Sequence, residues 1–491
     1  MLLSGQSQTL ALHVKSGAPI SAVWTFKSIY IIQDEDTIHQ SQAALKIHGS
    51  SSSNYLKKNY KLEFQDQEGS PINVAIGNMP ADDDYILHGP YSDKTLMRNA
   101  LAYYFARKIE PWAPRTQFAE LWLDEKYKGV YLIVEKIKIH KDRVDIENGS
   151  KGEPNNNRGF IISLDRVEEQ DHGWWSAYDN DPHWFELKDP DEDEISFSQR
   201  EYLKNYLKKF EDVLSGFEYA EPNIGYRRWA DEQSFINHLI LREFANDVDA
   251  YQLSTYMHKD AGGKLMMGPL WDNNLSFGNL NHCFSNLSTE YWAFNSDQHC
   301  DAKHPFWWDQ LLSDTLFLNN WNCTWSNLRN NILSDESINH VIDSLKLELA
   351  EISANNFEQW PVLQVNIPPN PTTYGSWDEA VEWMRSWILD RTNWIDNNIP
   401  GTCRTYPTPD FTQIISYPNP FKNYIQFAGF PERGGTLSIF DLNGDLKRRI
   451  NIEDKQFSYL IDNINDFPAS ISWQFIGLSG LTQQGILLKF E

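Results

Sequence analysis

Two aspartates, Asp249 and Asp272, bracket a stretch whose pattern predicts a β-hairpin. Short runs rich in Tyr, Leu and Met flank the turn Asp-Ala-Gly-Gly at 260–263, which is typical of a hairpin. A carboxylate at each end of a tight hairpin is brought to one edge of it. Phosphoryl transfer needs such a pair, because one carboxylate serves the attacking hydroxyl and the other holds the metal ion that neutralises the phosphates. The alternative is that both aspartates only cap turns, as isolated aspartates usually do. The spacing alone leaves both readings open.

Two predicted helices lead the chain to these aspartates. Ser198 and Glu201 form a capping box, and the helix that they begin stops at Gly216. A second helix opens at Asp231 and delivers the chain to Asn246 and Asp249. Beyond the hairpin, residues 305–399 are largely helical in pattern and rich in Trp.

A loop and strand near the N-terminus offer a place for phosphates. The loop Gly49 to Ser53 precedes a predicted strand at 57–64, in which Lys58 shares a face with the apolar Tyr60, Leu62 and Phe64. Backbone N–H groups of Gly49, Ser50 and Ser51 could bind phosphate oxygens, and an inward Lys58 would add positive charge. The alternative is a plain turn, because Gly-Ser runs usually are turns.

The remaining elements predict an α+β protein of two lobes followed by a small β domain. A helix is expected at 95–108 after Asp93, and strands at 118–123, at 129–134 closed by Glu135, and at 159–165. These make a mixed, mainly antiparallel sheet lobe ahead of the helical lobe, and a cleft between such lobes is where small ligands usually bind. Residues 1–400 form this body, 401–410 a linker with two prolines, and 411–491 a β-sandwich with an Asn443-Gly444 hairpin turn.

Composition excludes several classes of partner. The 491 residues carry a net charge of −25, which argues against nucleic acids and anionic membrane surfaces as partners. No apolar run approaches the ~20 residues of a membrane span. The first residues, MLLSGQSQTLALHV, lack the basic and apolar regions of a signal peptide, so we expect either a cytoplasmic protein or a chain whose native start is missing.

The four cysteines favour an oxidising compartment. Cys283 and Cys300 flank an insertion rich in Asn, Ser, Trp and Tyr, and we predict a disulfide that closes this loop. A bridge between Cys323 and Cys403 would tie the linker to the body. Four buried free thiols are the alternative.

Six blocks, spread in order over the first 400 residues, resemble the CotH-type atypical protein kinases. They are HGSSSSNYLKKNYKLEF (48–64), YILHGPYSDKTLMRNALA (85–102), GVYLIVEKIK (129–138), GFIISLD (159–165), NDVDAYQLSTYMHKD (246–260) and GPLWDNNLSFGN (268–279). The resemblance implies a bilobal kinase-like fold, ATP with Mg²⁺ or Mn²⁺ as cofactors, and Ser/Thr hydroxyls of a protein acceptor as substrates.

The resemblance also implies a role for each site residue. Asp249 matches the catalytic aspartate and Asp272, helped by Asn274, the metal-binding position. The loop residues Gly49, Ser50 and Ser51 with Lys58 match the nucleotide side, where Glu135 is the expected ion-pair partner of Lys58.

Two positions depart from the family pattern. Asn274 stands where an aspartate is frequent, and Ser254 where an asparagine is frequent. Both replacements are weaker metal ligands, which puts metal affinity and turnover in question but not the fold.

The tail resembles the C-terminal sorting domain of the type IX secretion system of Bacteroidetes. The matching features are SYPNPFKNYIQF, the LSIFDLNGDL hairpin and a final strand that begins at Gly485. An ordinary immunoglobulin-like accessory domain is the alternative. The resemblance implies a secreted or cell-surface bacterial protein that engages the type IX machinery, with its native signal peptide missing from this chain.

Two functions follow. The first is a secreted or surface kinase of the CotH type. The second is a catalytically inactive surface module that binds glycan or matrix protein, supported by Trp174, Trp175 and Trp184 and by the two departures.

Overall fold

The chain folds into two units, and each has a hydrophobic core of its own. Unit 1 spans Met1–Cys403 and unit 2 spans Arg404–Glu491. The structure, a computed structural model, describes residues 10–15, 17–152, 154, 157–167, 173–178, 183–221, 224–247, 249–282, 284–285, 287–298, 304–370 and 372–403 of unit 1, and residues 414–417, 421, 424–428, 434–441, 443–453, 458–461, 467–477 and 482–489 of unit 2.

Unit 1 begins with a closed β-barrel in the strand order β1-β2-β3-β4-β5-β7-β6. Its strands are β1 (Leu10–Lys15), β2 (Thr25–Gln33), β3 (Asp36–His48), β4 (Asn59–Gln65), β5 (Asp84–His88), β6 (Thr116–Leu123) and β7 (Lys126–Glu135). Neighbouring strands are antiparallel except at the closure, where β6 runs parallel to β1. Alternate residues such as Leu45, Leu62 and Ile133 fill the barrel interior. The predicted strands at 118–123 and 129–134 are therefore parts of β6 and β7.

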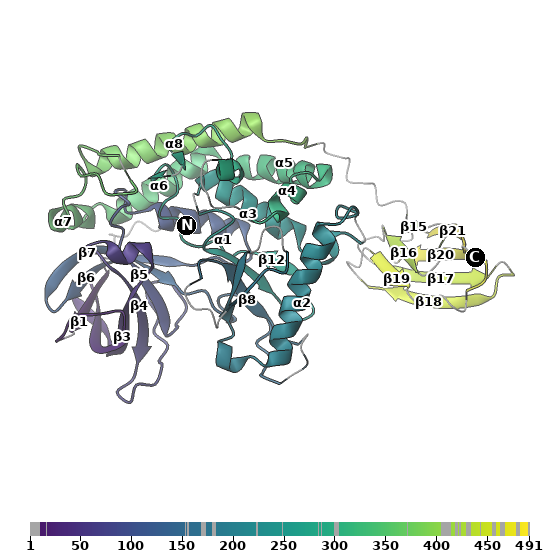
Figure 1. Cartoon of the computed structure of the whole chain (residues 1–491), viewed down its shortest axis with the longest axis horizontal. Coiled ribbons are helices and arrows are strands. Elements are labelled where there is room, and N and C mark those ends of the chain that lie inside the picture. The colour runs from purple at the N-terminus through teal and green to yellow at the C-terminus, as the bar shows by residue number, and fades with distance from the viewer. Residues whose placement is uncertain are drawn as a thin grey trace. The chain divides into compact units, whose positions relative to one another are not determined.

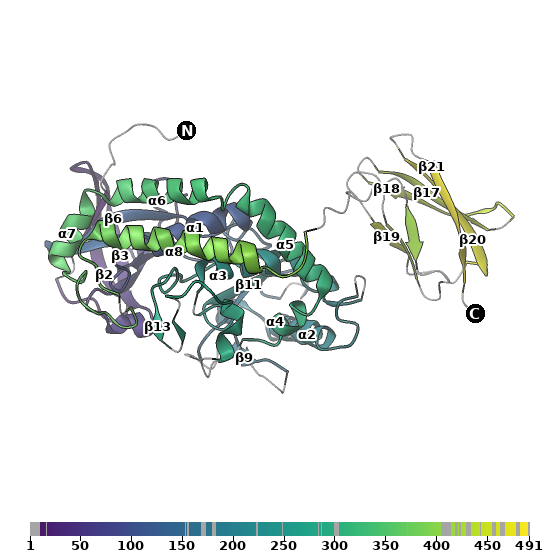
Figure 2. The ribbon, with the colours of Figure 1, turned by 90° about the horizontal axis from the view of Figure 1, so that it is seen from above.

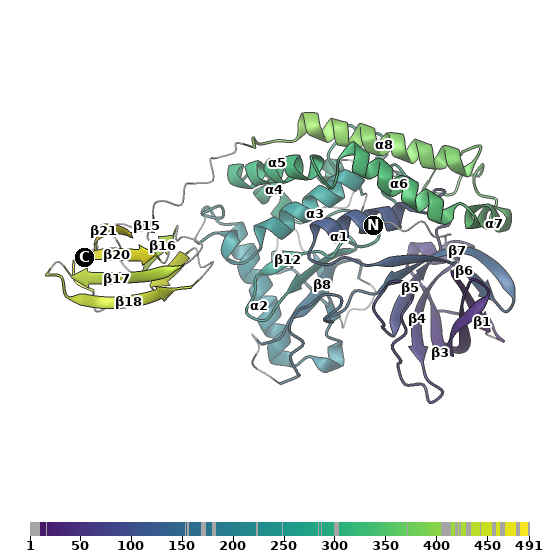
Figure 3. The ribbon, with the colours of Figure 1, turned by 180° about the vertical axis from the view of Figure 1, so that it is seen from behind.

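A second, five-stranded antiparallel sheet has the order β12-β11-β8-β10-β9. Its strands are β8 (Phe160–Leu164), β9 (Gly173–Trp175), β10 (Trp184–Asp189), β11 (Thr255–Lys259) and β12 (Leu265–Met267). Figures 1 and 3 show this sheet and the barrel next to each other beneath the helices.

The helices cover one side of both sheets. They are α1 (Arg98–Ile109), α2 (Phe197–Leu214), α3 (Glu232–Ala245), α4 (Trp307–Leu311), α5 (Thr315–Arg329), α6 (Asp335–Leu349), α7 (Ile352–Gln359) and α8 (Trp377–Asn398). Viewed from above, α8 runs across α3 and beside α6 (Figure 2). One large core joins these helices to the inner face of the five-stranded sheet and to the outer wall of the barrel, and it contains Ile162, Met257, Val134 and buried tryptophans of α4 and α5.

Short elements connect these parts. They are the 3-10 helices at Ser51–Asn54, Glu192–Glu194, Tyr226–Arg228 and Ala293–Gln298, and the strands β13 (Asn281–His282) and β14 (Phe284–Ser285). Among the helices that the structure describes, none combines the length and the apolar character needed to cross a membrane.

Of the two predicted helix starts, one is confirmed and one is wrong. Asp231 caps α3 as predicted, because its side chain accepts from the Ser234 N–H. The capping box predicted at Ser198 and Glu201 is wrong. It is formed by Ser196 and Gln199, two residues earlier, and α2 begins at Phe197.

Unit 2 holds a three-stranded and a four-stranded sheet around one core. The strands are β15 (Ile415–Tyr417), β16 (Ile425–Ala428), β17 (Gly435–Asp441), β18 (Leu446–Ile452), β19 (Ser458–Ile461), β20 (Ser470–Gly477) and β21 (Thr482–Leu488). The smaller sheet has the order β15-β16-β19 and the larger one β18-β17-β20-β21. Phe427 from the first and Phe475 from the second belong to the same buried cluster. Both units together make an α+β protein.

Candidate active site

The predicted β-hairpin is present and places the two aspartates at one end. β11 and β12 pair antiparallel, with Met257 opposite Met267. Asp249 precedes β11 and Asp272 follows β12, so both lie at the end of the hairpin away from its turn. The hairpin therefore brings together two carboxylates that are separated in sequence.

Arg242 holds the segments around this end of the hairpin. It lies in the last turn of α3, is fully buried, and forms an ion pair with the equally buried Asp247. The same guanidinium donates to the carbonyl of Ser254 at 3.0 Å and to that of Trp271 at 3.3 Å. One side chain thus links the loop before Asp249, the start of β11 and the residue before Asp272.

Helix α1 fixes the backbone around Asp272. The Asp272 N–H donates to the Tyr103 hydroxyl at 3.1 Å, and the Asn273 N–H donates to Asn99 Oδ1 at 2.7 Å. Arg98 donates to the carbonyls of Ser276 and Phe277. Asp272 has a φ of 56°, a left-handed conformation that is uncommon for a non-glycine residue, and these contacts hold it there.

A third carboxylate, Asp165, lies at the same edge. It follows β8, and β8 pairs with β11 so that Leu164 is opposite Thr255. Burial, with the nearby Asp247 and Asp165 carboxylates, raises the pKa of Asp272 to about 6. Burial, with Asp247 and Asp272, raises the pKa of Asp249 to about 7. The edge therefore gathers negative charge that is half-buried and mutually repelling.

Within the described residues, neither Asp249, Asp272 nor Asp165 has a lysine or arginine in ion-pair contact. Asp247 is different, because Arg242 neutralises it. Hard carboxylate oxygens suit Mg²⁺ and Mn²⁺, which are usually held by one or two carboxylates together with phosphate oxygens and water. The residues present fit such a cation on the side of Asp272.

The two residues that differ from the family pattern, Asn274 and Ser254, lie beside this edge. Asn274 is half-buried, and its carbonyl accepts from the Asn279 side chain at 2.7 Å, which leaves its amide group for other contacts. Ser254 has a φ of 47°, and its carbonyl is bound by Arg242. Ser254 therefore contributes its backbone to the frame of the site.

The comparison with protein families decides the family. The model described as CotH kinase protein matches residues 45–395. The chain belongs to the CotH kinase family. The matched range contains Asp249 and Asp272 with the elements that hold them, and a kinase-like function follows from membership.

Other comparisons add little to the CotH assignment. The search of curated proteins gave no match. Among solved structures, the chain is similar to the twitchin kinase region from C. elegans, at 10% identity over 98% of this chain and 94% of that one, with a TM-score of 0.13. A likeness at that TM-score carries no argument about the fold.

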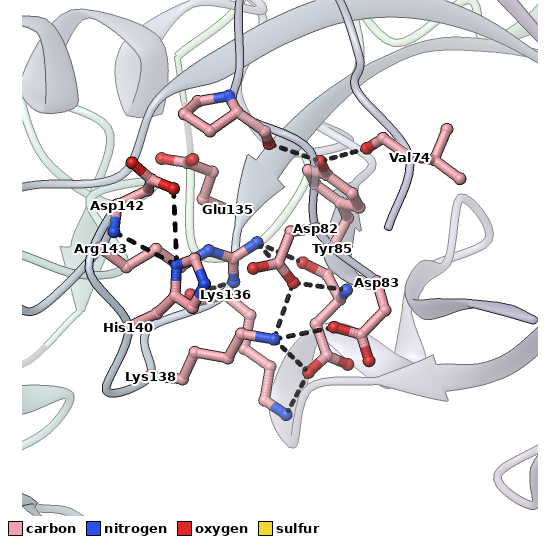
Figure 4. A network of polar contacts seen from close by, with 12 residues as sticks. Val74, Asp82, Asp83, Tyr85, Glu135, Lys136, Lys138, His140, Asp142 and Arg143 are labelled. Atoms are coloured by element: carbon pink, nitrogen blue, oxygen red, sulfur yellow. Dashed lines mark hydrogen bonds and ion pairs between the residues drawn. The ribbon is translucent and has the colours of Figure 1, made fainter. Parts of the chain in front are cut away.

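Another acidic cluster of this CotH kinase, Asp82, Asp83 and Asp84, has the spacing of a metal site but not the charge. It is the one described group in which three such ligand atoms lie within 4.8 Å of one another. Lys138 Nζ lies 2.7, 2.9 and 3.4 Å from carboxylate oxygens of the three aspartates, and the Arg143 guanidinium lies 3.1 Å from Asp82. Figure 4 shows Lys138 beside Asp82 and Asp83. The cluster is an ion-pair network that ties the start of β5 to the segment after β7, and cations of the protein already neutralise it.

The predicted inward position of Lys58 is wrong. β4 begins at Asn59, so the two-residue period that orients Tyr60 and Leu62 does not extend back to Lys58. Lys58 Nζ donates to the carbonyl of Ser53 at 2.7 Å. The buried lysine is Lys57, which donates to Asn356 Oδ1 at 2.8 Å.

The predicted pairing of Glu135 with Lys58 is also wrong. Glu135 is buried and receives two N–H groups of the Arg115 guanidinium and the Arg115 backbone N–H at 2.8 to 3.0 Å. A carboxylate that is bound bidentately by arginine is not free to orient a lysine.

The loop predicted to bind phosphate is a turn at the surface. Gly49 has a φ of 95°, and Ser51 begins a 3-10 helix. Gly49, Ser50 and Ser51 are exposed, and the Ser50 carbonyl accepts from the Ser53 hydroxyl at 2.6 Å. Their assignment to the nucleotide stays a prediction.

Within the described residues, a disulfide joins Cys323 and Cys403, with an S–S distance of 2.10 Å. It ties the end of unit 1 to α5, which is the bridge that the sequence suggested between the linker and the body. The predicted bridge between Cys283 and Cys300 lies outside the described residues.

Sequence reasoning missed Arg242, Asp247 and Asp165. The signal for Asp247 was present, because two aspartates follow the helix in the run Asn-Asp-Val-Asp. Only the fold shows that Asp247 pairs with Arg242, whereas Asp249 has no ion-pair partner within the described residues.

Proposed function

We propose that this CotH kinase transfers the γ-phosphate of ATP to serine or threonine hydroxyls of a protein acceptor. The observation that carries the proposal is the meeting of Asp249 and Asp272 at one end of the β11–β12 hairpin. The match to a family of kinases supports it independently.

Asp249 would act on the acceptor hydroxyl. Its carboxylate accepts a hydrogen bond from the hydroxyl, orients the oxygen toward the phosphate, and takes the proton as the oxygen attacks. A base works best when its pKa lies near the operating pH, and burial with two neighbouring carboxylates raises the pKa of Asp249 to about 7. Neutral pH therefore leaves a large fraction of Asp249 both ionised and basic.

Asp272 would hold the divalent cation, with Asn274 as a neutral second oxygen ligand. A bound Mg²⁺ or Mn²⁺ neutralises charge on the phosphates during transfer. Asp272 is positioned for this by the Tyr103 hydroxyl and by its left-handed backbone. Asp247 takes no part in binding the cation, because Arg242 neutralises it.

Unit 2 would direct export as a sorting domain of the type IX system, which makes the protein secreted or cell-surface bound. The support is the sequence of the tail together with a separate core. A disulfide in unit 1 suits the oxidising surroundings of an exported protein. Deleting unit 2 should abolish export from the native host, and export of the truncated chain at the normal level would remove this part of the proposal.

The alternative, a surface module that binds glycan, has one favourable observation. Trp175 on the edge strand β9 is 56% exposed and contacts Trp184 edge to face, with ring centroids 5.3 Å apart. However, Trp184 is buried, and Trp174 packs against Phe185. A single exposed ring is a small platform for a sugar, so the kinase is the better supported function.

Transfer of radiolabelled γ-phosphate from ATP to serine-rich proteins, with Mn²⁺ or Mg²⁺, tests the proposal. The wild type should label an acceptor, and Asp249→Asn should reduce the rate by roughly 10²- to 10⁴-fold, the usual contribution of a catalytic base. Asp272→Asn should raise the concentration of Mn²⁺ or Mg²⁺ that is needed for half-maximal transfer, because it removes a charged metal ligand.

Asp260→Asn is the matched control. Asp260 lies in the turn at the opposite end of the same hairpin, where its Oδ1 accepts from the Glu147 and Ala261 N–H groups, and asparagine keeps that acceptor. Equal labelling by the wild type and the Asp249→Asn variant would refute the proposal.

A further inference from the structure

The loop that follows Asp272 is held in place by side chains. Residues 273–280, all of which the structure describes, form neither a helix nor a strand. Asp272, Phe277 and Gly278 have φ values of 56°, 50° and 76°. Non-glycine residues adopt such left-handed conformations only where their surroundings hold them. The orientation of Asn274 within this loop therefore depends on the groups that bind the loop.

Two buried asparagines, Asn279 and Asn370, supply one of these supports and are here called the asparagine pair. Their exposed fractions are 0% and 1%. Asn279 Nδ2 donates to the carbonyl of Asn274 at 2.7 Å, which closes the loop on itself. Asn279 Oδ1 accepts a hydrogen bond from Asn370 Nδ2. Because the donor and the acceptor of the Asn279 amide bind different segments, the amide is fixed in one orientation.

Asn370 is fixed in turn by the surrounding backbone. Its Nδ2 also donates to the carbonyl of Ser92 at 3.0 Å, and its Oδ1 accepts from the Thr372 N–H at 2.9 Å. Its backbone N–H donates to the carbonyl of Ile367 at 2.8 Å and closes a tight turn. Both N–H groups and the oxygen of the Asn370 amide thus have partners, so Asn370 is a fixed donor for Asn279.

The turn at Asn370 belongs to the segment between α7 and α8, which is attached to the rest of unit 1 at further points. Lys94 Nζ donates to the carbonyl of Val365 at 2.7 Å. The Tyr55 hydroxyl donates to the carbonyl of Pro368 at 2.9 Å. A chain of hydrogen bonds therefore runs from this anchored segment through the asparagine pair to the backbone of Asn274.

The alternative is that the asparagine pair serves stability alone. Buried amides are costly unless they are hydrogen-bonded, and these two are fully used in joining three segments distant in sequence. A stabilising role changes the melting temperature of the protein. It leaves the affinity of the folded protein for a metal ion unchanged, so the two roles can be separated by experiment.

We propose that Asn279 and Asn370 are positioning residues for the divalent cation, because they fix the backbone at Asn274 and so direct its side-chain oxygen to the ion beside Asp272. The inference rests on the proposed kinase function, in which Asn274 is the neutral metal ligand. A neutral oxygen binds Mg²⁺ or Mn²⁺ less strongly than a carboxylate does, so its contribution depends on being held in place. Groups that orient metal ligands usually account for roughly 10- to 100-fold in affinity.

Titration of the full chain with Mn²⁺ alone, followed by the electron paramagnetic resonance signal of the free ion, tests the inference without transfer. Asn370→Ala and Asn274→Ala should each weaken Mn²⁺ binding by roughly 10-fold. The double variant should bind Mn²⁺ no more weakly than Asn274→Ala, because Asn370 acts through Asn274. Asn370→Asp keeps the shape and the acceptor for the Thr372 N–H but lacks the donor for Asn279, so it should reproduce the loss even if Asn370→Ala does not fold.

Tyr55→Phe is the matched control. It removes another hydrogen bond of the same segment, the one to Pro368, and leaves the asparagine pair intact, so its Mn²⁺ affinity should equal that of the wild type. Melting temperatures without Mn²⁺ record the effect of each variant on stability. Lower melting temperatures of Asn370→Ala and Asn370→Asp with wild-type Mn²⁺ affinity would overturn the inference, as would a further loss of affinity in the double variant.

The same titration separates failure of the inference from failure of the proposed function. Wild-type Mn²⁺ affinity of Asn274→Ala, or no saturable Mn²⁺ binding by the wild type, would refute the metal site itself and the inference with it. A loss of affinity in Asn274→Ala without one in the Asn370 variants would refute only the positioning role of the asparagine pair.

Discussion

At the edge of the hairpin, the role of each aspartate depends on whether a positively charged side chain pairs with it. Asp247 and Asp249 are two positions apart, and burial raises the pKa of both, but Arg242 forms an ion pair with Asp247. Asp247 is fully buried and paired, whereas Asp249 is half-buried and has no ion-pair partner in the described structure, and this separates a structural aspartate from a candidate base. The same argument distinguishes Asp272 from the neutralised cluster at Asp82–Asp84.

A buried glutamate behind the site makes stability depend on pH. Glu110 accepts from the Leu270 N–H at 2.9 Å and lies 3.9 Å from His238. Burial raises its pKa from 4.5 to about 8. The folded state therefore keeps a proton that the unfolded state releases near 4.5, so this group destabilises the fold progressively as pH rises from about 4.5 to about 8.

Glu110→Gln should remove that dependence and keep the acceptor for Leu270. Relative to the wild type, the variant should gain stability between pH 5 and pH 8, by up to ~1.4 kcal/mol for each pH unit in the window. Burial lowers the pKa of His238 well below its usual value, which disfavours its charged form in both proteins. Melting temperatures at both pH values provide the measurement, and a constant difference between the two proteins would contradict the assignment.

At the scale of elements, Arg242 and Asp247 form a buried pair that joins α3 to the hairpin. Arg242→Met should destabilise the protein by about 3 to 5 kcal/mol, because it leaves Asp247 buried and unpaired. The double variant Arg242→Met, Asp247→Leu should recover much of that stability but little transfer activity, since the loop before Asp249 loses its tie to β11. Denaturant unfolding and the transfer assay measure the two effects.

Lys208→Met serves as the control for this series. Lys208 pairs with Asp212 on the surface of α2, with both side chains about half exposed, and such pairs contribute ~0 to 1 kcal/mol. A loss in Arg242→Met no larger than that of the surface variant would show that Arg242 does not organise the site.

Local patterns predicted the elements around the aspartates, and long-range contacts decided the rest. Period-two alternation found the strands that became β4, β6, β7 and β8, and the turn residues found the hairpin. Closure of the barrel through β1 and β6 could not be predicted, because it joins segments that share no local signal. Lys58 was misplaced because parity was extended one residue beyond the start of β4, and on the same strand Lys61 is the outward lysine.

The ion-pair partners of buried charged residues could not be predicted from the sequence either. Glu135 ends β7 and pairs with Arg115, which precedes β6, only because those two strands are adjacent. Asp165 joined the site because β8 is the neighbour of β11. Strand order, which no local pattern encodes, fixed these contacts.

At the scale of the whole molecule, the two units should be thermodynamically independent. Each has its own core, and the Cys323–Cys403 disulfide lies entirely within unit 1. A chain that ends after Cys403 should therefore keep the melting temperature of unit 1 and the affinity for Mn²⁺–ATP. Calorimetric scans of the full and truncated proteins compare them, and loss of the unit 1 transition on truncation would show that the tail is an integral part of the body.

The most direct test of the whole account is a crystal structure with a non-hydrolysable ATP analogue and Mn²⁺, in which anomalous scattering locates the metal. The account predicts a Mn²⁺ ion bound to Asp272 and the terminal phosphate facing Asp249. A metal peak at Asp82–Asp84 with none at Asp272, or a nucleotide bound away from the β11–β12 hairpin, would contradict it.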